Sequence, residues 1–236
     1  MSPITFVGIG FGAIQGGLCL FEAAHSGRFQ RLVVAEVIPE VVDAVRRNGG
    51  AYNVCVAHPD GIKTHSIKGV EIFNPSVPAD RRALAEAIRD AQEIATALPS
   101  VDFFERGGAI SAAALLADGL ALKNDATPRA VIYTAENHNH AAELLDAALD
   151  RRWGPRSGTV RRHIQCLNTV VGKMSGVVTD QAQLAAQNLA PIAPGIRRAF
   201  LVEEFNRILI TRVRWPDFKR AIGVFEEKDD LLAFEE

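Results

Sequence analysis

Apolar residues in the first fifty positions form two short continuous runs, each followed by a helix-like pattern. Residues 4–7 are β-branched or aromatic and lead into glycine, which predicts a buried strand. From residue 13 to 25 apolar residues recur at helical spacing, and Gly27 ends the pattern. Residues 31–37 form a second apolar run, typical of a parallel strand covered on both faces, and Pro39–Arg47 predicts a second helix. The order is strand, helix, strand, helix.

The remainder of the chain continues this rhythm after one interruption. Residues 52–73 alternate around Pro59-Asp60-Gly61, which predicts a β-hairpin. Beyond Pro78 the pattern predicts helices over 80–90, 109–122 and 138–151, and strands over 93–97, 130–135, 162–167, 199–203 and 207–213. We therefore predict an α/β, Rossmann-type doubly wound, mostly parallel sheet with a small hairpin insertion and a mixed C-terminal extension. The expected division is a dinucleotide-binding domain over 1–153 and its extension over 154–236.

Composition adds little to this pattern but excludes some classes of function. The 236 residues are 48% hydrophobic and carry a net charge of −2, which is typical of a soluble globular protein and argues against nucleic acid as a partner. Three widely spaced cysteines suit a reducing cytoplasm. The apolar opening lacks the basic segment and cleavage site of a signal peptide, and its glycines break the run that a membrane span needs.

The first turn matches a dinucleotide-binding motif. Gly8-Ile9-Gly10-Phe11-Gly12-Ala13 fits G-x-G-x-x-G/A between a predicted strand and a predicted helix. The first glycine permits the tight turn, the second lets the backbone approach a diphosphate, and the small Ala13 lets helix pack on strand. The N–H groups of the helix start would face the anion, and Gln15 would add another donor.

Two further pieces of the motif follow. Glu36 closes the second predicted strand, where a carboxylate accepts hydrogen bonds from the adenosine ribose and repels a 2′-phosphate, so that NAD is favoured over NADP. Ala97 lies in a run of small residues after a strand, where bulk would block a cofactor. The alternative is that the glycines only allow close packing and that Glu36 is a solvated strand end.

Polar residues cluster where the strand over 130–135 passes into a helix. Asn137 can direct its amide at a substrate carbonyl, and Glu136 can orient that amide or bind a ribose. His138 and His140 have a spacing found in metal sites, but no Asp or Cys nearby completes a ligand set, so we expect no metal. Lys173 can serve a phosphate or a proton transfer, or is a solvated charge.

Together these features resemble the polyol-specific long-chain dehydrogenase family, which includes mannitol dehydrogenase and mannitol-phosphate dehydrogenase. The resemblance rests on residues 8–13, the strand VVAEV, the loop ATALP, the pair Glu136-Asn137 and the segment LNTVVGK. It implies an NAD-dependent enzyme that interconverts a sugar alcohol, or its phosphate, and a ketose. It also implies that Asn137 binds the reacting oxygen.

The same resemblance leaves the catalytic base open. Family members continue into a helical C-terminal domain with a Lys, an Asn and a His, whereas no such residue follows Lys228 here. Oxidising an alcohol requires a base for the hydroxyl proton. We expect a C-terminal catalytic domain or a partner chain to supply it, with EEKDDLLAFEE starting an amphipathic helix. The alternatives are a non-enzymatic dinucleotide-binding module and a domain for another phosphate ligand.

Overall fold

The computed structural model describes residues 4–172, 174–204, 207–229 and 231. Its larger sheet has eight strands, in the order β12-β11-β8-β7-β6-β1-β2-β5. Their bounds are β1 (Thr5–Ile9), β2 (Arg31–Ala35), β5 (Val70–Phe73), β6 (Glu93–Thr96), β7 (Ala130–Thr134), β8 (Ile164–Val170), β11 (Ile208–Thr211) and β12 (Phe225–Lys228). The six strands from β5 to β8 are mutually parallel, and β11 joins β8 antiparallel. Counted along the chain, these six have the Rossmann order 3-2-1-4-5-6, which confirms the predicted fold class.

Helices cover both faces of this sheet, and alternate residues of each central strand enter different cores. Val7 and Ile9 of β1 pack with α3 (Pro78–Asp90), α4 (Ala112–Leu120) and α5 (Ala141–Trp153). Phe6 points to the other face, toward α2 (Pro39–Arg47) and the helix after β1. That helix begins at Ala13, passes through the π-helical turn η1 (Gln15–Cys19) and continues as α1 (Leu20–His25). The period-2 alternation thus builds the two-layered cover of a doubly wound sheet.

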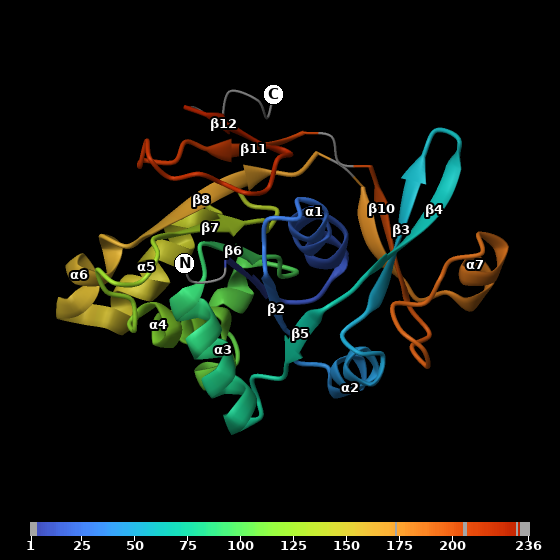
Figure 1. Cartoon of the computed structure of the whole chain (residues 1–236), viewed down its shortest axis with the longest axis horizontal. Coiled ribbons are helices and arrows are strands. Elements are labelled where there is room, and N and C mark those ends of the chain that lie inside the picture. The colour runs from blue at the N-terminus through green and yellow to red at the C-terminus, as the bar shows by residue number, and fades with distance from the viewer. Residues whose placement is uncertain (1–3, 173, 205–206, 230, 232–236) are drawn as a thin grey trace.

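A second, four-stranded sheet lies on the side of α1 that faces away from the larger sheet (Figure 1). Its order is β4-β3-β10-β9, with β3 (Tyr52–His58), β4 (Gly61–Ile67), β9 (Ser175–Val178) and β10 (Ala199–Glu203). The strands β3 and β4 form the predicted hairpin, turning at His58 and Gly61. β10 then pairs parallel with β3, so the extension completes a sheet that the hairpin begins. η1 contacts β1 and β6 on one side and β3 and β10 on the other.

Short elements connect these layers. They are the helices α6 (Ser157–Arg161) and α7 (Gln181–Ala186) and the 3₁₀ turns η2 (Val101–Phe104), η3 (Gly108–Ile110) and η4 (Gly154–Arg156). Among the residues that the structure describes, no helix is both long and apolar enough to cross a membrane.

Two local predictions are wrong. The alternating stretch over 52–73 is not one hairpin, because its last part, β5, leaves β4 and pairs parallel with β2 at the edge of the larger sheet. The acidic segment near the C-terminus does not start as a helix, because Glu226, Glu227 and Lys228 lie in β12 beside β11. Phe225, buried at 4% exposure in the core, anchors that strand. The last five residues of the predicted helix, 232–236, lie outside the described residues.

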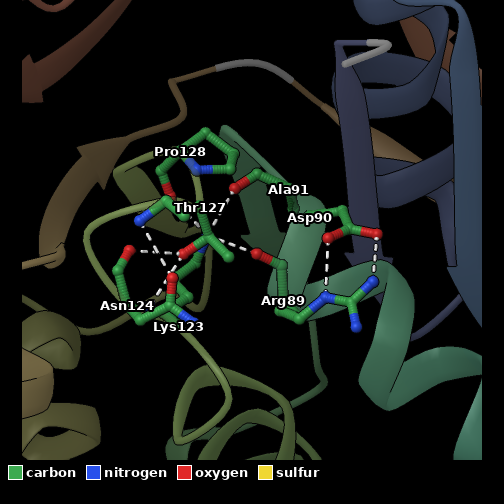
Figure 2. Close-up of polar contacts among 8 residues, drawn as sticks. Arg89, Asp90, Ala91, Lys123, Asn124, Thr127 and Pro128 are labelled. Carbon is green, nitrogen blue, oxygen red and sulfur yellow. Dashed lines mark hydrogen bonds and ion pairs between the residues drawn. The ribbon is translucent and has the colours of Figure 1, made fainter.

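A buried lysine fastens the connections at the amino ends of β6 and β7 (Figure 2). Lys123 is 6% exposed, and its ammonium donates to the main-chain carbonyls of Arg89 and Ala91 at 2.8 Å and of Pro128 at 2.7 Å. Arg89 and Ala91 stand at the C-terminal end of α3, where a cation is favoured by the helix dipole. Lys123 therefore joins the end of α3 to the loop that enters β7.

Candidate functional site

The glycine turn follows the carboxyl end of β1. Gly10 has φ +86°, and its N–H donates to the Ala35 carbonyl at 3.1 Å. A Cβ on Gly10 would lie 2.9 Å from Leu98 Cδ2 and 3.0 Å from the Ala97 carbonyl oxygen, so the turn packs directly on the loop after β6. Glycine is required here both by the left-handed backbone and by this close approach.

The helix that follows begins with an open side. The Gly12 carbonyl accepts the Gly16 N–H at 2.8 Å, which makes Gly12 the N-cap residue. Apart from its two chain neighbours, no atom of the described residues would lie within 4 Å of a Cβ built on Gly12. The first-turn N–H groups have no partner within their own helix and carry its positive end. The turn therefore offers an anion a set of main-chain donors beside unfilled space.

Other residues of the motif serve the interior. The Phe11 ring is 5% exposed and meets Tyr52 and Phe200 edge-on, and Ala13 is also buried. Gln15 is fully buried, and a Cβ on Gly8 would overlap its amide group. Both amide atoms of Gln15 are buried and have no hydrogen-bond partner among the residues that the structure describes. The Gln15 amide therefore does not reach the outer surface of the turn. The side chains of Phe11 and Ala13 are also buried, so only their main-chain groups can face a ligand.

Glu36 lies at the carboxyl end of β2 and is folded toward the glycine turn. It is 7% exposed, and its Oε1 accepts the Ile38 N–H at 2.8 Å. Burial raises the pKa of its carboxyl group, and hydrogen bonds from the main-chain N–H groups of Ile38, Val37 and Phe11 oppose that rise. The Phe11 bond ties the carboxylate to the turn itself. The alternative of a solvated strand end is contradicted by this burial.

Glu136 connects the ends of β6 and β7. Glu136 is 3% exposed. Its Oε2 accepts a hydrogen bond from the Thr96 hydroxyl at 2.9 Å, and its Oε1 accepts one from the Leu98 N–H at 2.9 Å. Burial raises the pKa of Glu136 to about 7, although these two hydrogen bonds act in the opposite direction. Ala97, between its two partners, donates its own N–H to the Ile9 carbonyl at 3.1 Å. The predicted residues Ala97 and Glu136 therefore do come together, next to Gly10.

A cavity of about 300 Å³ opens at the carboxyl ends of β7 and β8. It reaches from the first turn of the glycine helix to the start of β9, and its lining includes Ile14, Glu136, Asn137, Thr169 and Ser175. Asn137 is exposed, so its amide can bind a ligand in this cavity without breaking a buried hydrogen bond. The fold thus places Asn137 and the helix that follows the glycine turn around one space.

The two histidines after Asn137 lie at the entry to α5. His138 Nδ1 accepts the His140 N–H at 3.1 Å, and both side chains are exposed. Within the described part of the chain, no group of three or more His, Cys, Asp or Glu residues could hold a metal ion. Lys173, the other predicted catalytic residue, lies outside the described residues.

Comparison with known proteins gives structural matches and no sequence matches. No protein-family model matches the chain, and neither does any curated protein. Mannitol 2-dehydrogenase of Pseudomonas fluorescens, solved as a ternary complex with NAD and D-mannitol, is similar over 98% of this chain with a TM-score of 0.69 and 12% identity. The chain shares the fold of the matching part of that protein. It spans 54% of that mannitol dehydrogenase, about half its length.

Two other dehydrogenases show the same likeness. A substrate-free D-sorbitol dehydrogenase matches 98% of this chain and 55% of its own, with a TM-score of 0.72 and 11% identity. An octopine dehydrogenase with NADH and L-arginine matches 97% of this chain and 49% of its own, with a TM-score of 0.55 and 12% identity. At these identities the likeness concerns the fold.

Two residues that organise this edge of the sheet, Thr96 and Asn168, lie in the segments ATALP and LNTVVGK, although no role was expected of them. Thr96 supplies the hydroxyl that Glu136 accepts, and a polar residue closing the apolar strand EIAT was the available signal. Asn168 caps α5, since its Oδ1 accepts the Ala142 N–H at 2.8 Å and its Nδ2 donates to Glu143 at 2.9 Å. Asn168 thus shapes the cavity wall by fixing the start of α5.

Proposed function

We propose that this chain binds NAD(H) and forms the cofactor-binding part of an oxidoreductase that interconverts a sugar alcohol, or its phosphate, and a ketose. One observation carries the proposal: the open N-terminus of the glycine helix, the Glu36 carboxylate tied to the turn, and the cavity with Asn137 occupy one edge of a Rossmann sheet. Ligands of such sheets bind at the carboxyl ends of the strands. The NAD and NADH in the structures of similar fold agree with this choice of cofactor.

Each residue of the glycine turn and the adjoining strand ends has a proposed role in binding NAD(H). The main-chain N–H groups of Gly12 and Ala13 would hold the diphosphate, since that of Phe11 already donates to Glu36, and Gly12 leaves room for it. Glu36 would accept the adenosine ribose hydroxyls, and Ala97 would border the cofactor. Bound NAD would take up a hydride from the alcohol carbon. Gln15 and Gly8 would support the turn from inside, because both lie behind it.

Asn137 would orient the reacting oxygen. Its amide N–H can donate to that oxygen, and a fixed donor stabilises the negative charge that develops there. The hydroxyl proton needs a base, which we assign to a further C-terminal domain or partner chain, with Lys173 as a second candidate for a phosphate group or a proton. We assign the protein to the cytoplasm, since its three cysteines are buried free thiols.

The direct test is titration of the purified chain with NADH, followed by calorimetry and by nicotinamide fluorescence. Saturable binding at or below millimolar NADH is expected, and its absence would contradict the proposal. Oxidation of sugar alcohols and their phosphates is then assayed with the chain alone and with an added C-terminal segment. Binding without turnover in either case would favour the non-enzymatic module, whereas protection from heat by a sugar phosphate and not by NAD would favour another phosphate ligand.

Glu36→Gln tests the choice between NADH and NADPH. Removing the carboxylate weakens the bond to the ribose and removes repulsion of a 2′-phosphate. We expect the ratio of the Kd for NADPH to the Kd for NADH to fall about tenfold, equivalent to about 1.4 kcal/mol. Glu71→Gln is the matched control, because Glu71 is exposed on the edge strand β5 and pairs with Arg31 at 2.8 Å. An unchanged ratio in Glu36→Gln would contradict the role of Glu36.

A further inference from the structure

Glu136 makes contacts that reach beyond its own strand. It directly precedes Asn137, yet its carboxylate points back into the protein and is bound by Thr96, the last residue of β6, and by Leu98 in the loop that follows. Thr96 is fully buried, and its carbonyl accepts the Ala135 N–H at 2.9 Å. Glu136 and Ala135 therefore fix the end of β6 to the end of β7 through both side chain and main chain.

The loop held by Glu136 is the one on which the glycine turn packs. Leu98 Cδ2 and the Ala97 carbonyl oxygen are the nearest atoms to the missing Cβ of Gly10, at 2.9 and 3.0 Å. A movement of Leu98 away from Glu136 would therefore change the support under Gly10. The buried Glu136 carboxylate thus lies between the glycine turn and Asn137. It accepts hydrogen bonds from Thr96 and Leu98 beside the turn, and Asn137 is the next residue in the chain.

The charge on Glu136 decides how strongly it holds that loop. A carboxylate accepts from both donors with charge-assisted hydrogen bonds, which are stronger than those of a neutral carboxyl group. From η1 the titratable group that bears on Glu136 is the Cys19 thiol, whose pKa is raised by burial, so Cys19 stays neutral. The Thr96 and Leu98 groups from β6 do not titrate. On its own segment, His138 lies two residues away and is exposed.

We propose that Glu136 is a positioning residue, whose ionised carboxylate holds the Ala97–Leu98 loop against the Gly10 turn and so sets the bound dinucleotide relative to Asn137. This rests on the proposed function, because it assumes that NADH binds at the turn. Burial keeps part of the Glu136 population protonated near pH 7, since it raises the pKa to about 7. NADH affinity of the wild type should therefore rise between pH 6 and pH 8.5, by about tenfold, within the usual range of coupling between two sites.

The experiment measures the Kd for NADH at pH 6 and pH 8.5 in four variants. Glu136→Gln resembles the protonated carboxyl group and should bind NADH at both pH values as weakly as the wild type does at pH 6. Thr96→Val removes one donor and should move the pH midpoint upward, whereas Thr96→Ser should restore the wild-type profile. Thr134→Val is the matched control, because Thr134 is an equally buried strand-end threonine, paired in register with Thr96, that donates to the Leu167 carbonyl.

Thermal unfolding of the same variants provides a readout that does not need NADH. The folded pKa of Glu136 lies above its ordinary value of 4.5, so the folded state holds a proton that the unfolded chain loses. The wild type should therefore lose stability relative to Glu136→Gln as the pH rises from 4.5 to about 7.

The outcomes separate the two claims. If the wild type binds no NADH at any pH, the proposed function is overturned, and this inference with it. If NADH binds with the same pH profile in the wild type, Glu136→Gln and Thr96→Val, the cofactor site stands and the positioning role is overturned. A pH-dependent stability difference without a difference in NADH affinity would also overturn it, because Glu136 would then be structural only.

Discussion

Gly12→Asp should weaken NADH binding strongly without unfolding the chain. Beyond its chain neighbours, the new Cβ meets no atom of the described residues within 4 Å, and aspartate at an N-cap accepts hydrogen bonds from the first-turn N–H groups. Its carboxylate would also fill the space beside the Gly12 and Ala13 N–H groups that we assign to the diphosphate, and it would repel the anion. We expect the Kd for NADH to rise roughly 100-fold, the scale of losing one or two charge-assisted hydrogen bonds. Calorimetry measures the Kd, and circular dichroism checks the fold.

The fold should respond in the opposite direction. An acid at a helix N-terminus stabilises the helix by about 0.5–1 kcal/mol, so the Tm of Gly12→Asp should be unchanged or higher. Gly158→Asp is the matched control: its Cβ is equally free, it lies in the first turn of α6, and it should leave the Kd unchanged. If Gly12→Asp stays folded and binds NADH as the wild type does, the diphosphate does not lie at this turn.

Lys123→Met should destabilise the fold more than other single lysine substitutions. Methionine fills the channel of the side chain but leaves the carbonyls of Arg89, Ala91 and Pro128 without their buried donor. An unsatisfied buried polar group costs about 1–3 kcal/mol, and three share one donor here, so we expect a loss of about 3 kcal/mol. For a chain of this size that lowers the Tm by roughly 6–12 °C, measured by differential scanning calorimetry.

The stability difference should also depend on pH. Burial lowers the pKa of Lys123 to about 7 from an ordinary value of 10.5. Between these values the unfolded chain binds more protons than the folded one, so wild-type stability rises with pH and its margin over Lys123→Met should widen. Lys63→Met serves as the control, because Lys63 is 56% exposed and pairs with Asp60, and its loss should be below about 0.5 kcal/mol. Equal losses in both variants would contradict the account of Lys123.

Local patterns predicted most of the fold. The apolar runs, the glycine turn and the helix starts at Pro39 and Pro78 depend on neighbours in sequence, and they predicted the Rossmann sheet. Long-range pairing was not predictable in the same way. Val70–Phe73 alternates like the hairpin before it, and only its pairing with β2 places it in the other sheet. β12 carries two adjacent acidic residues, Glu226 and Glu227, and forms a strand because it pairs with β11 at the edge of the sheet.

The candidate site, too, could be predicted from the sequence only where it depends on neighbouring residues. The motif indicated where an anion can bind, and it pointed to Gly10 as the position where a Cβ would block the diphosphate. In the structure, that Cβ would first strike Leu98 and Ala97, so a substitution at Gly10 tests folding and binding together. A substitution at Gly12 separates binding from folding, because its Cβ would project into open space. The partners of Glu136, forty residues earlier at Thr96, lie next to it because β6 and β7 are adjacent in the sheet, which no local pattern specifies.

The most direct test of the central claim is a crystal of this chain soaked with NADH. We expect the diphosphate at the main-chain N–H groups of Gly12 and Ala13, with the adenosine ribose at Glu36 and the nicotinamide toward Asn137. A turn that stays empty at millimolar NADH, or a dinucleotide bound elsewhere on the chain, would contradict it.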